Sequence, residues 1–197
     1  MSIADIKHMG LFEVDVLRIV TDLDNKAITD YTLQHREKWD RYTTYHDQEL
    51  NKDWQYGLPD RARLENAMIE AGNEFVKRTK RKPFEERPFL YYWCSVYDEG
   101  DQHGSHNHPN SLLAGTYYPS VGADSSSIQL EAPWKSHIMH DNVPIGVYSY
   151  KPNPGDMLMW PSWIEHRVHK QKKPNKPRIA ISFNLDYNWA KIRKHHD

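Results

Sequence analysis

Residues 88–97, Pro-Phe-Leu-Tyr-Tyr-Trp-Cys-Ser-Val-Tyr, begin the part of the chain whose sequence is typical of β structure. From this point on, short runs of aromatic and β-branched residues are separated by Gly, Pro, Asn and Ser, which favour turns. So many short runs with turn signals between them predict a mainly β protein with a closed or two-sheet architecture. The expected strands are 89–97, 112–118, 127–131, 146–151, 156–160, 166–169 and 178–187.

The chain before residue 88 has a different pattern. Residues 60–80 predict a helix, because apolar residues recur at helical spacing and Asp60 can cap the first turn. We expect this apolar face to pack on the sheet that follows. The stripe consists of Leu64, Ala67, Met68, Ala71, Phe75 and Val76.

The rest of the N-terminal part gives weaker signals. Residues 26–40 are a second helix candidate, whereas residues 41–59 are polar and aromatic with no clear period. We therefore expect a helical or irregular support region over residues 1–87 and a β core over residues 88–190. With 197 residues and no break in composition, both parts should form one structural domain.

Composition limits the classes of partner. The chain has 26 basic and 27 acidic residues, and this balance gives no signal for nucleic-acid or membrane-surface binding. A single cysteine, Cys94, excludes an intramolecular disulfide framework and fits a reducing compartment. The first residues lack a secretory signal pattern, and no apolar run approaches about 18 residues. We expect a cytoplasmic protein that does not cross a membrane.

Three histidines form a candidate metal-binding and catalytic set. His106 and His108 are two residues apart, and alternate side chains of an extended backbone point to the same side. His166 could complete a site with three protein ligands, which leaves metal positions open for chemistry. A lone histidine is more often a surface or core residue, so the remaining histidines are left aside, with His103 as a reserve ligand.

Arg178 begins a second candidate site. In the run Arg-Ile-Ala-Ile-Ser-Phe-Asn, residues 178–184, the side chains of Arg178, Ser182 and Asn184 share one face of a strand. If this face is buried, Arg178 needs an anion, because an unpaired buried charge is costly. A ligand carboxylate could then be held by a bidentate fork. The alternative is an outward arginine that pairs with surface carboxylates.

The order of these motifs resembles the iron(II)- and 2-oxoglutarate-dependent oxygenases. It runs from His106-x-His108 through Gly-Thr-Tyr-Tyr at 115–118 and Pro-Gly-Asp at 154–156 to His166 and Arg178. Within this family, the order looks most like that of a branch of oxygenases in bacteria and tailed phages that carries an H-x-H motif. The resemblance covers about residues 85–187. It implies a double-stranded β-helix, a cupin-like jelly roll of eight strands buttressed by the N-terminal helices.

The resemblance also implies a ligand set. His106 and His166 take the two histidine positions of the iron triad, and His108 takes the position that Asp or Glu usually holds. A neutral third ligand removes one negative charge, which should alter the redox potential and weaken metal retention. If His108 turns away from the metal, His103 or Glu131 could replace it.

For 2-oxoglutarate, Arg178 matches the family's anchor of the distal carboxylate. Many family members have Ser where this chain has Ala180, so another residue should supply a hydrogen bond. Tyr117 and Tyr118 are candidates, but their opposite parity allows only one of them to face the cavity. We expect Tyr117 to do so and to complete the cofactor-binding set with Arg178, Ser182 and Asn184.

The implied function is that of a non-haem dioxygenase using Fe(II), 2-oxoglutarate and O2. It would hydroxylate an unidentified substrate, a small molecule or a protein side chain, and release succinate and CO2. The setting would be the host cytoplasm if a phage encodes the chain, and the N-terminal helices could pair two subunits as a homodimer. Two alternatives stay open: a cupin-like metal enzyme that does not use 2-oxoglutarate, and a non-enzymatic metal-binding β-sandwich. Whether Arg178 faces the metal cavity distinguishes the first alternative from the dioxygenase, and a closed zinc site would favour the second.

Overall fold

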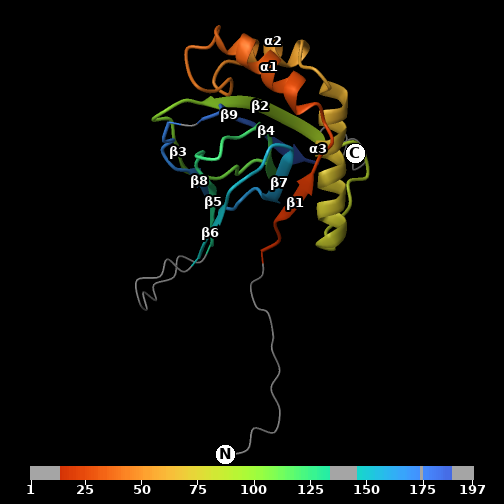
Figure 1. Ribbon diagram of the computed structural model, residues 1–197. Helices are drawn as coiled ribbons and strands as arrows, with labels where there is room; N and C mark the ends of the chain where they lie inside the picture. The colour runs from red at the N-terminus through yellow and green to blue at the C-terminus, as the bar shows by residue number, and fades with distance from the viewer. Residues whose placement is uncertain (1–13, 134–145, 174, 188–197) are drawn as a thin grey trace, which may run out of the picture.

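The computed structural model describes residues 14–133, 146–173 and 175–187. Nine strands and three helices follow one another along these residues (Figure 1). Their order is β1 (Leu17–Val20), α1 (Asn25–Arg36), α2 (Gln48–Tyr56), α3 (Arg61–Arg78), β2 (Phe89–Tyr97), β3 (His103–His106), β4 (Leu113–Ser120), β5 (Ile128–Glu131), β6 (Val147–Tyr150), β7 (Asp156–Pro161), β8 (His166–Val168) and β9 (Arg178–Asp186).

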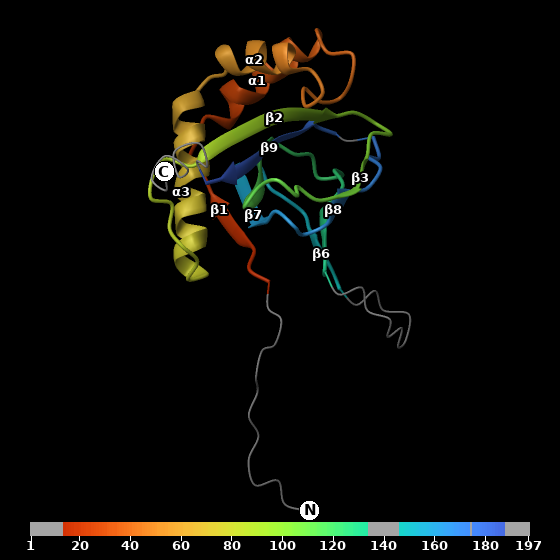
Figure 2. The same cartoon turned by 180° about the vertical axis from the view of Figure 1, so that it is seen from behind.

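The strands form two antiparallel sheets. The first has the order β1-β7-β4-β9-β2, and the second has the order β3-β8-β5-β6. The helices cover the outer side of the five-stranded sheet, and the four-stranded sheet lies on its other side (Figures 1 and 2). The prediction of a mainly β, two-sheet protein with N-terminal helices is thus confirmed.

Strand parity divides the core into two layers. Alternate residues of β9, from Ile179 to Leu185, pack with apolar side chains of the helices. The other face of β9, which begins with Arg178 and includes Ala180, is turned towards the four-stranded sheet. The polar face of β9 therefore lies between the two sheets, where it can contribute to an enclosed site.

The predicted strands are all present, and three short elements were missed. Strand β1 has only four residues at the edge of its sheet, and β3, His-Gly-Ser-His, has no apolar alternation. Helix α2 is polar, but Asp47 caps it by accepting a hydrogen bond from the Leu50 amide at 2.9 Å. These elements depend on pairing and capping rather than on an apolar pattern. The region expected to be helical or irregular therefore also contributes a strand, β1.

The expected cap of α3 is wrong. Asp60 stands at the N-cap position but has a left-handed backbone with φ of 54°, and its side chain makes no capping hydrogen bond. Its carboxylate instead accepts hydrogen bonds from the Asp24 amide at 3.1 Å and from Arg63 at 3.0 Å. Asp60 thus ties the starts of two helices together.

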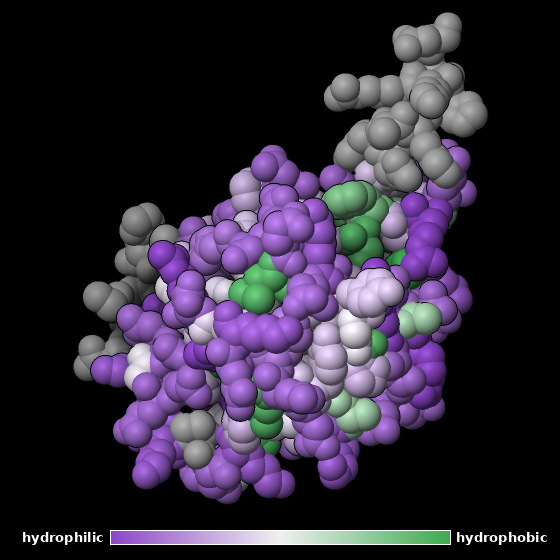
Figure 3. Space-filling view, turned by 90° about the horizontal axis from the view of Figure 1, so that it is seen from above, coloured by the Kyte–Doolittle hydropathy of each residue, from purple (hydrophilic) through white to green (hydrophobic). Residues whose placement is uncertain are grey.

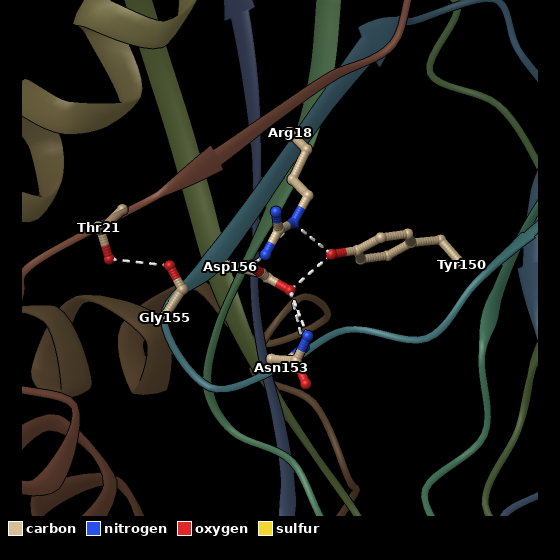
Figure 4. A network of polar contacts seen from close by, with 6 residues as sticks. All are labelled: Arg18, Thr21, Tyr150, Asn153, Gly155 and Asp156. Atoms are coloured by element: carbon tan, nitrogen blue, oxygen red, sulfur yellow. Dashed lines mark hydrogen bonds and ion pairs between the residues drawn. The ribbon is translucent and has the colours of Figure 1, made fainter.

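A polar network joins the edge strands of the two sheets (Figure 4). Asp156, only 1% exposed, accepts hydrogen bonds from Arg18 of β1 at 2.8 Å and from the Tyr150 hydroxyl of β6 at 2.6 Å. The Asn153 amide donates a third bond at 2.7 Å. Burial alone raises the pKa of Asp156, but the hydrogen bonds from Tyr150, Asn153 and Arg18 outweigh it and lower that pKa below its ordinary value.

The outer surface over the helices is mostly hydrophilic, with small separate apolar areas (Figure 3). This view shows no broad apolar face on which two subunits would pair. The homodimer stays a prediction. Among the described residues, no helix is both long enough and apolar enough to cross a bilayer.

Candidate metal centre

The pairing of β3 with β8 brings two of the predicted ligands together. His106 is the last residue of β3 and lies opposite His166, the first residue of β8, in this antiparallel pair. His108 follows in the loop that leads to β4, and its backbone amide donates a hydrogen bond to the Ser162 carbonyl at 2.9 Å. The loop is thereby held against the segment that precedes β8.

The three imidazoles converge on one point. One ring nitrogen from each of His106, His108 and His166 can be chosen so that all lie within 4.8 Å of one another. The ring centroids of His106 and His166 are 4.2 Å apart, and those of His108 and His166 are 5.1 Å apart. The donor set of three imidazoles in this spacing suits a divalent transition metal.

The two reserve ligands lie outside this group. His103 stacks on His106 with ring centroids 4.3 Å apart, but its Nδ1 contacts the Tyr42 hydroxyl at 3.2 Å. Glu131 accepts a hydrogen bond from Ser105 at 3.1 Å and lies 3.4 Å from the Nε of Arg167. In the described part of the chain, the histidines thus form a cluster without a carboxylate.

Hydrogen bonds at Nδ1 orient two of the rings. The Nδ1 of His106 donates to the Gly104 carbonyl at 2.9 Å, and the Nδ1 of His166 donates to the Ile164 carbonyl at 3.1 Å. Because a carbonyl can only accept, both protons must be on Nδ1, which leaves each Nε2 with a free lone pair. These rings are therefore set to bind a metal through Nε2.

The environment keeps the imidazoles of His108 and His166 neutral. Burial, together with the neighbouring histidines, lowers the pKa of His166 to about 3 and that of His108 to about 4. A metal takes the neutral form of imidazole, so no proton has to be removed from these rings near pH 7. The cluster thus fits the iron ion that the sequence resemblance implies.

Arg178 faces the same cavity as the three histidines. Its side chain is completely buried, and its Nε and Nη1 find no hydrogen-bond partner among the described residues. The guanidinium lies over the ring of Tyr97 at 4.5 Å from the centroid and 5.3 Å from that of Tyr118. The alternative of an outward, surface-paired Arg178 is therefore wrong. A buried cation with two free donors is suited to a carboxylate of a ligand.

The expectation that Tyr117 faces the cavity is wrong. Tyr117 is buried on the helix side of β4, where its hydroxyl donates to Asn25 of α1. Tyr118 lines the cavity instead, and its buried hydroxyl has no partner within the described residues. Parity alone does not show which face of a strand the helices cover, so this choice needed the tertiary structure.

The other two residues of the predicted cofactor set have different surroundings. Ser182 lines the cavity, and its Oγ lies 3.4 Å from the Oγ1 of Thr116. Asn184 is one pleat further along β9, where its amide nitrogen lies 3.3 Å from the Nδ1 of His108. Asn184 thus contacts a histidine of the cluster rather than the surroundings of Arg178.

Tyr97 was not predicted as a site residue. It is the last residue of β2 and stands opposite Arg178 in the β2–β9 register, so its ring meets the guanidinium face. The parity of the strand predicted at residues 89–97 could have placed Tyr97 on the same face as Trp93. The register with β9, which decides the contact with Arg178, was not available from the sequence.

Comparisons with known proteins give one family and a set of similar folds. Residues 91–184 match the family described as "Putative 2OG-Fe(II) oxygenase". A comparison with curated protein sequences gives no match. The matched range contains all three histidines of the cluster and also Arg178. Whether the chain lies in a branch of bacteria and tailed phages stays a prediction.

Solved structures support the fold. A prolyl-4-hydroxylase of Pseudomonas putida is 10% identical, with a TM-score of 0.56 over 89% of this chain and 94% of that one. The carbocyclase SnoK from nogalamycin biosynthesis is 12% identical, with a TM-score of 0.59 over 88% of this chain and 80% of that one. AviO1 from Streptomyces viridochromogenes Tue57 is 10% identical, with a TM-score of 0.53 over 89% and 91% of the two chains. The expected double-stranded β-helix is thus confirmed.

Proposed function

Because residues 91–184 belong to the 2OG-Fe(II) oxygenase family, we propose that this chain hydroxylates an unidentified substrate with release of succinate and CO2. The chain is an oxidoreductase of the 2-oxoglutarate-dependent oxygenase type, for which the family implies Fe(II), 2-oxoglutarate and O2. In this reaction one oxygen atom of O2 enters the substrate as a hydroxyl group. The other enters succinate, as 2-oxoglutarate loses CO2.

The observation that carries the proposal is the convergence of two unlike groups in one cavity. The cavity is lined by three imidazoles that can bind a metal. It is also lined by a buried arginine, Arg178, with two free hydrogen-bond donors. A metal-binding protein without 2-oxoglutarate would have no use for the buried cation, whose burial is costly. This argument favours the dioxygenase over the two alternatives. Fe(II) would be held by His106, His108 and His166.

The remaining cavity residues would hold the cosubstrate. Arg178 would bind the distal carboxylate of 2-oxoglutarate through its free Nε and Nη1, and the Tyr118 hydroxyl would donate a further hydrogen bond. Ala180 leaves room on the same face of β9, and Ser182 could contact the chain of the ligand. When bound, iron and 2-oxoglutarate supply the oxidising power that these side chains lack. The side chains contribute orientation and exclusion of water.

The replacement of the usual carboxylate by His108 would have electrostatic consequences. A site of three neutral imidazoles leaves the full charge of a divalent ion to the incoming ligands. Such a site should attract doubly charged 2-oxoglutarate but hold the metal itself less tightly than a carboxylate-containing site. We expect the metal to be lost readily on treatment with a chelator.

The substrate stays open. The similar structures include a prolyl-4-hydroxylase and a carbocyclase, so one fold serves very different substrates. A small molecule and a protein side chain are both compatible with the site as described. The cytoplasmic location and the absence of a nucleic-acid partner stay predictions from composition.

The test is an anaerobic titration of Fe(II) and then 2-oxoglutarate into the apo-protein. Bidentate chelation of ferrous iron by a 2-oxo acid gives a visible charge-transfer band. We expect this band in the wild type and its loss in both His166→Ala and Arg178→Ala. Iron binding without the band would favour the cupin-like metal enzyme. No metal binding, or tight zinc with a closed fourth ligand, would favour a non-enzymatic β-sandwich.

A further inference from the structure

The three histidines differ in what holds their Nδ1 atoms. His106 and His166 each donate to a backbone carbonyl, which admits one tautomer only. The Nδ1 of His108 instead meets the side-chain amide of Asn184, whose nitrogen lies 3.3 Å away. An amide offers a donor on one side and an acceptor on the other, so it can serve either tautomer of an imidazole.

In the structure three hydrogen bonds form a chain. Asn184 donates to His108, His108 donates to His166, and His166 donates to the Ile164 carbonyl. His166 carries its proton on Nδ1, so its Nε2 is an acceptor, and it lies 3.3 Å from the Nε2 of His108. His108 must then carry its proton on Nε2 and accept a hydrogen bond at Nδ1 from the Asn184 amide nitrogen. This tautomer of His108 has no lone pair on Nε2, the atom that faces the Nε2 of His166.

Binding a metal through Nε2 requires the other tautomer of His108. The proton must then be on Nδ1, and the neighbouring group must accept it. Asn184 can do so after a half-turn of its amide, which exchanges nitrogen and oxygen without moving the backbone. Its Oδ1 is buried and has no hydrogen-bond partner among the described residues, so this turn breaks no bond of that oxygen.

We infer that Asn184 is a positioning residue whose amide turns to accept the Nδ1 proton of His108 and thereby commits His108 to metal binding. The inference rests on the proposed function, because it assigns a role at the same metal site. It also changes the expected role of Asn184 from contact with the cosubstrate to control of a ligand. The position is well fixed, because β9 is paired on both sides there, with Ala114 of β4 and Tyr91 of β2.

The first experiment titrates Co(II) into the apo-protein without 2-oxoglutarate. Loss of an outer-shell partner of a metal-binding histidine typically weakens metal affinity by about 10- to 100-fold, and we expect this loss in Asn184→Leu. Asn184→Asp is nearly the same shape and keeps an acceptor, so it should bind Co(II) at least as tightly as the wild type. Ser182→Ala, a change on the same strand face, should leave Co(II) affinity unchanged.

The second measurement is the proton NMR spectrum of the Co(II) protein. Each histidine that binds through Nε2 contributes an exchangeable, paramagnetically shifted Nδ1 proton, so the wild type should show three such signals. Asn184→Leu should lose one signal or exchange that proton faster with water, which a merely structural role would not cause. If this variant fails to fold, Asn184→Asp should still retain all three signals with the third exchanging no faster than in the wild type.

The outcomes separate this inference from the proposed function. Wild-type protein that does not bind Co(II) would overturn both. If Asn184→Leu binds Co(II) within threefold of the wild-type affinity and shows three unchanged proton signals, the inference is overturned and the proposed function stands. Normal Co(II) binding by Asn184→Leu with a selective loss of 2-oxoglutarate affinity would return Asn184 to the role expected from the sequence.

Discussion

Replacing Arg178 by Met should stabilise the ligand-free protein and remove most of the stabilisation that 2-oxoglutarate provides. Methionine nearly fills the volume of the arginine stem but carries no charge and no unpaired donors. In the wild type, Nε and Nη1 are buried without a partner within the described residues. Each such donor costs about 1–3 kcal/mol. The stacking of the guanidinium on Tyr97 and Tyr118 returns about 1–2 kcal/mol in total.

The balance predicts that Arg178→Met stabilises the ligand-free protein by a few kcal/mol, comparable to the gain of about 1–4 kcal/mol found when buried ion pairs are replaced by well-packed apolar groups. 2-Oxoglutarate works against this gain, because the wild type binds it more tightly than the variant does. Loss of a bidentate, charge-assisted contact should cost about 3 kcal/mol of 2-oxoglutarate binding, or about 100-fold in Kd. At about 100 times the wild-type Kd, the wild type gains about 2.7 kcal/mol and the variant only about 0.4 kcal/mol.

The assay is urea unfolding with saturating Co(II), with and without 2-oxoglutarate, in a buffer free of phosphate and small carboxylates that could pair with Arg178. Arg63→Met is the control, because Arg63 is half exposed and pairs with Asp22 and Asp60 at the surface. We expect it to change stability by less than about 1 kcal/mol and to leave the effect of 2-oxoglutarate intact. The reasoning would be refuted by an Arg178→Met protein that is less stable than the wild type without ligand, or that binds 2-oxoglutarate within threefold of it.

Three further predictions concern the two faces of β4 and the network of Asp156. Tyr118→Phe should weaken 2-oxoglutarate binding by about fivefold, the equivalent of one hydrogen bond, and leave the Co(II) affinity unchanged. Tyr117→Phe should change neither affinity, and calorimetry measures both. Gly115→Ala should destabilise the fold by about 1–3 kcal/mol in urea unfolding, because its Cβ would meet the Leu158 carbonyl oxygen at 2.7 Å and the Phe183 ring, and unchanged stability would contradict the packing described. Because the pKa of Asp156 is lower in the folded than in the unfolded protein, its contribution to stability is fully present above about pH 4 and is lost as the pH falls through the folded value. The unfolding free energy of Asp156→Asn should therefore fall less steeply with acid than that of the wild type, and parallel pH profiles would exclude this role.

The sequence was informative wherever a local pattern carries the structure. The strands of the β core and the long helix followed from the spacing of their apolar residues, as in the run 89–97 that forms β2. Strand β3, His-Gly-Ser-His, has no such pattern and exists because β8 offers it a hydrogen-bonding edge. Its identification required the partner strand, although it carries one of the candidate metal ligands.

For the candidate site, residue types and spacing predicted His106, His108, His166 and Arg178, and the fold places all four around one cavity. Chemistry limits which side chains can bind a metal or a carboxylate, and the alternation of strands limits which of them can act together. The parts of a site can thus be recognised in a sequence before the distances between them are known.

Tertiary packing decided between residues that the local sequence pattern does not distinguish. Tyr117 and Tyr118 are adjacent residues of the same type whose side chains point to opposite faces of β4. The helices cover the face that carries Tyr117, so the Tyr118 side chain is the one that lines the cavity. The role of Asn184 likewise depends on the approach of His108 from a loop 76 residues away in the chain. Such choices depend on long-range contacts, whose free energy comes from burial and hydrogen bonding between segments that the local sequence does not relate.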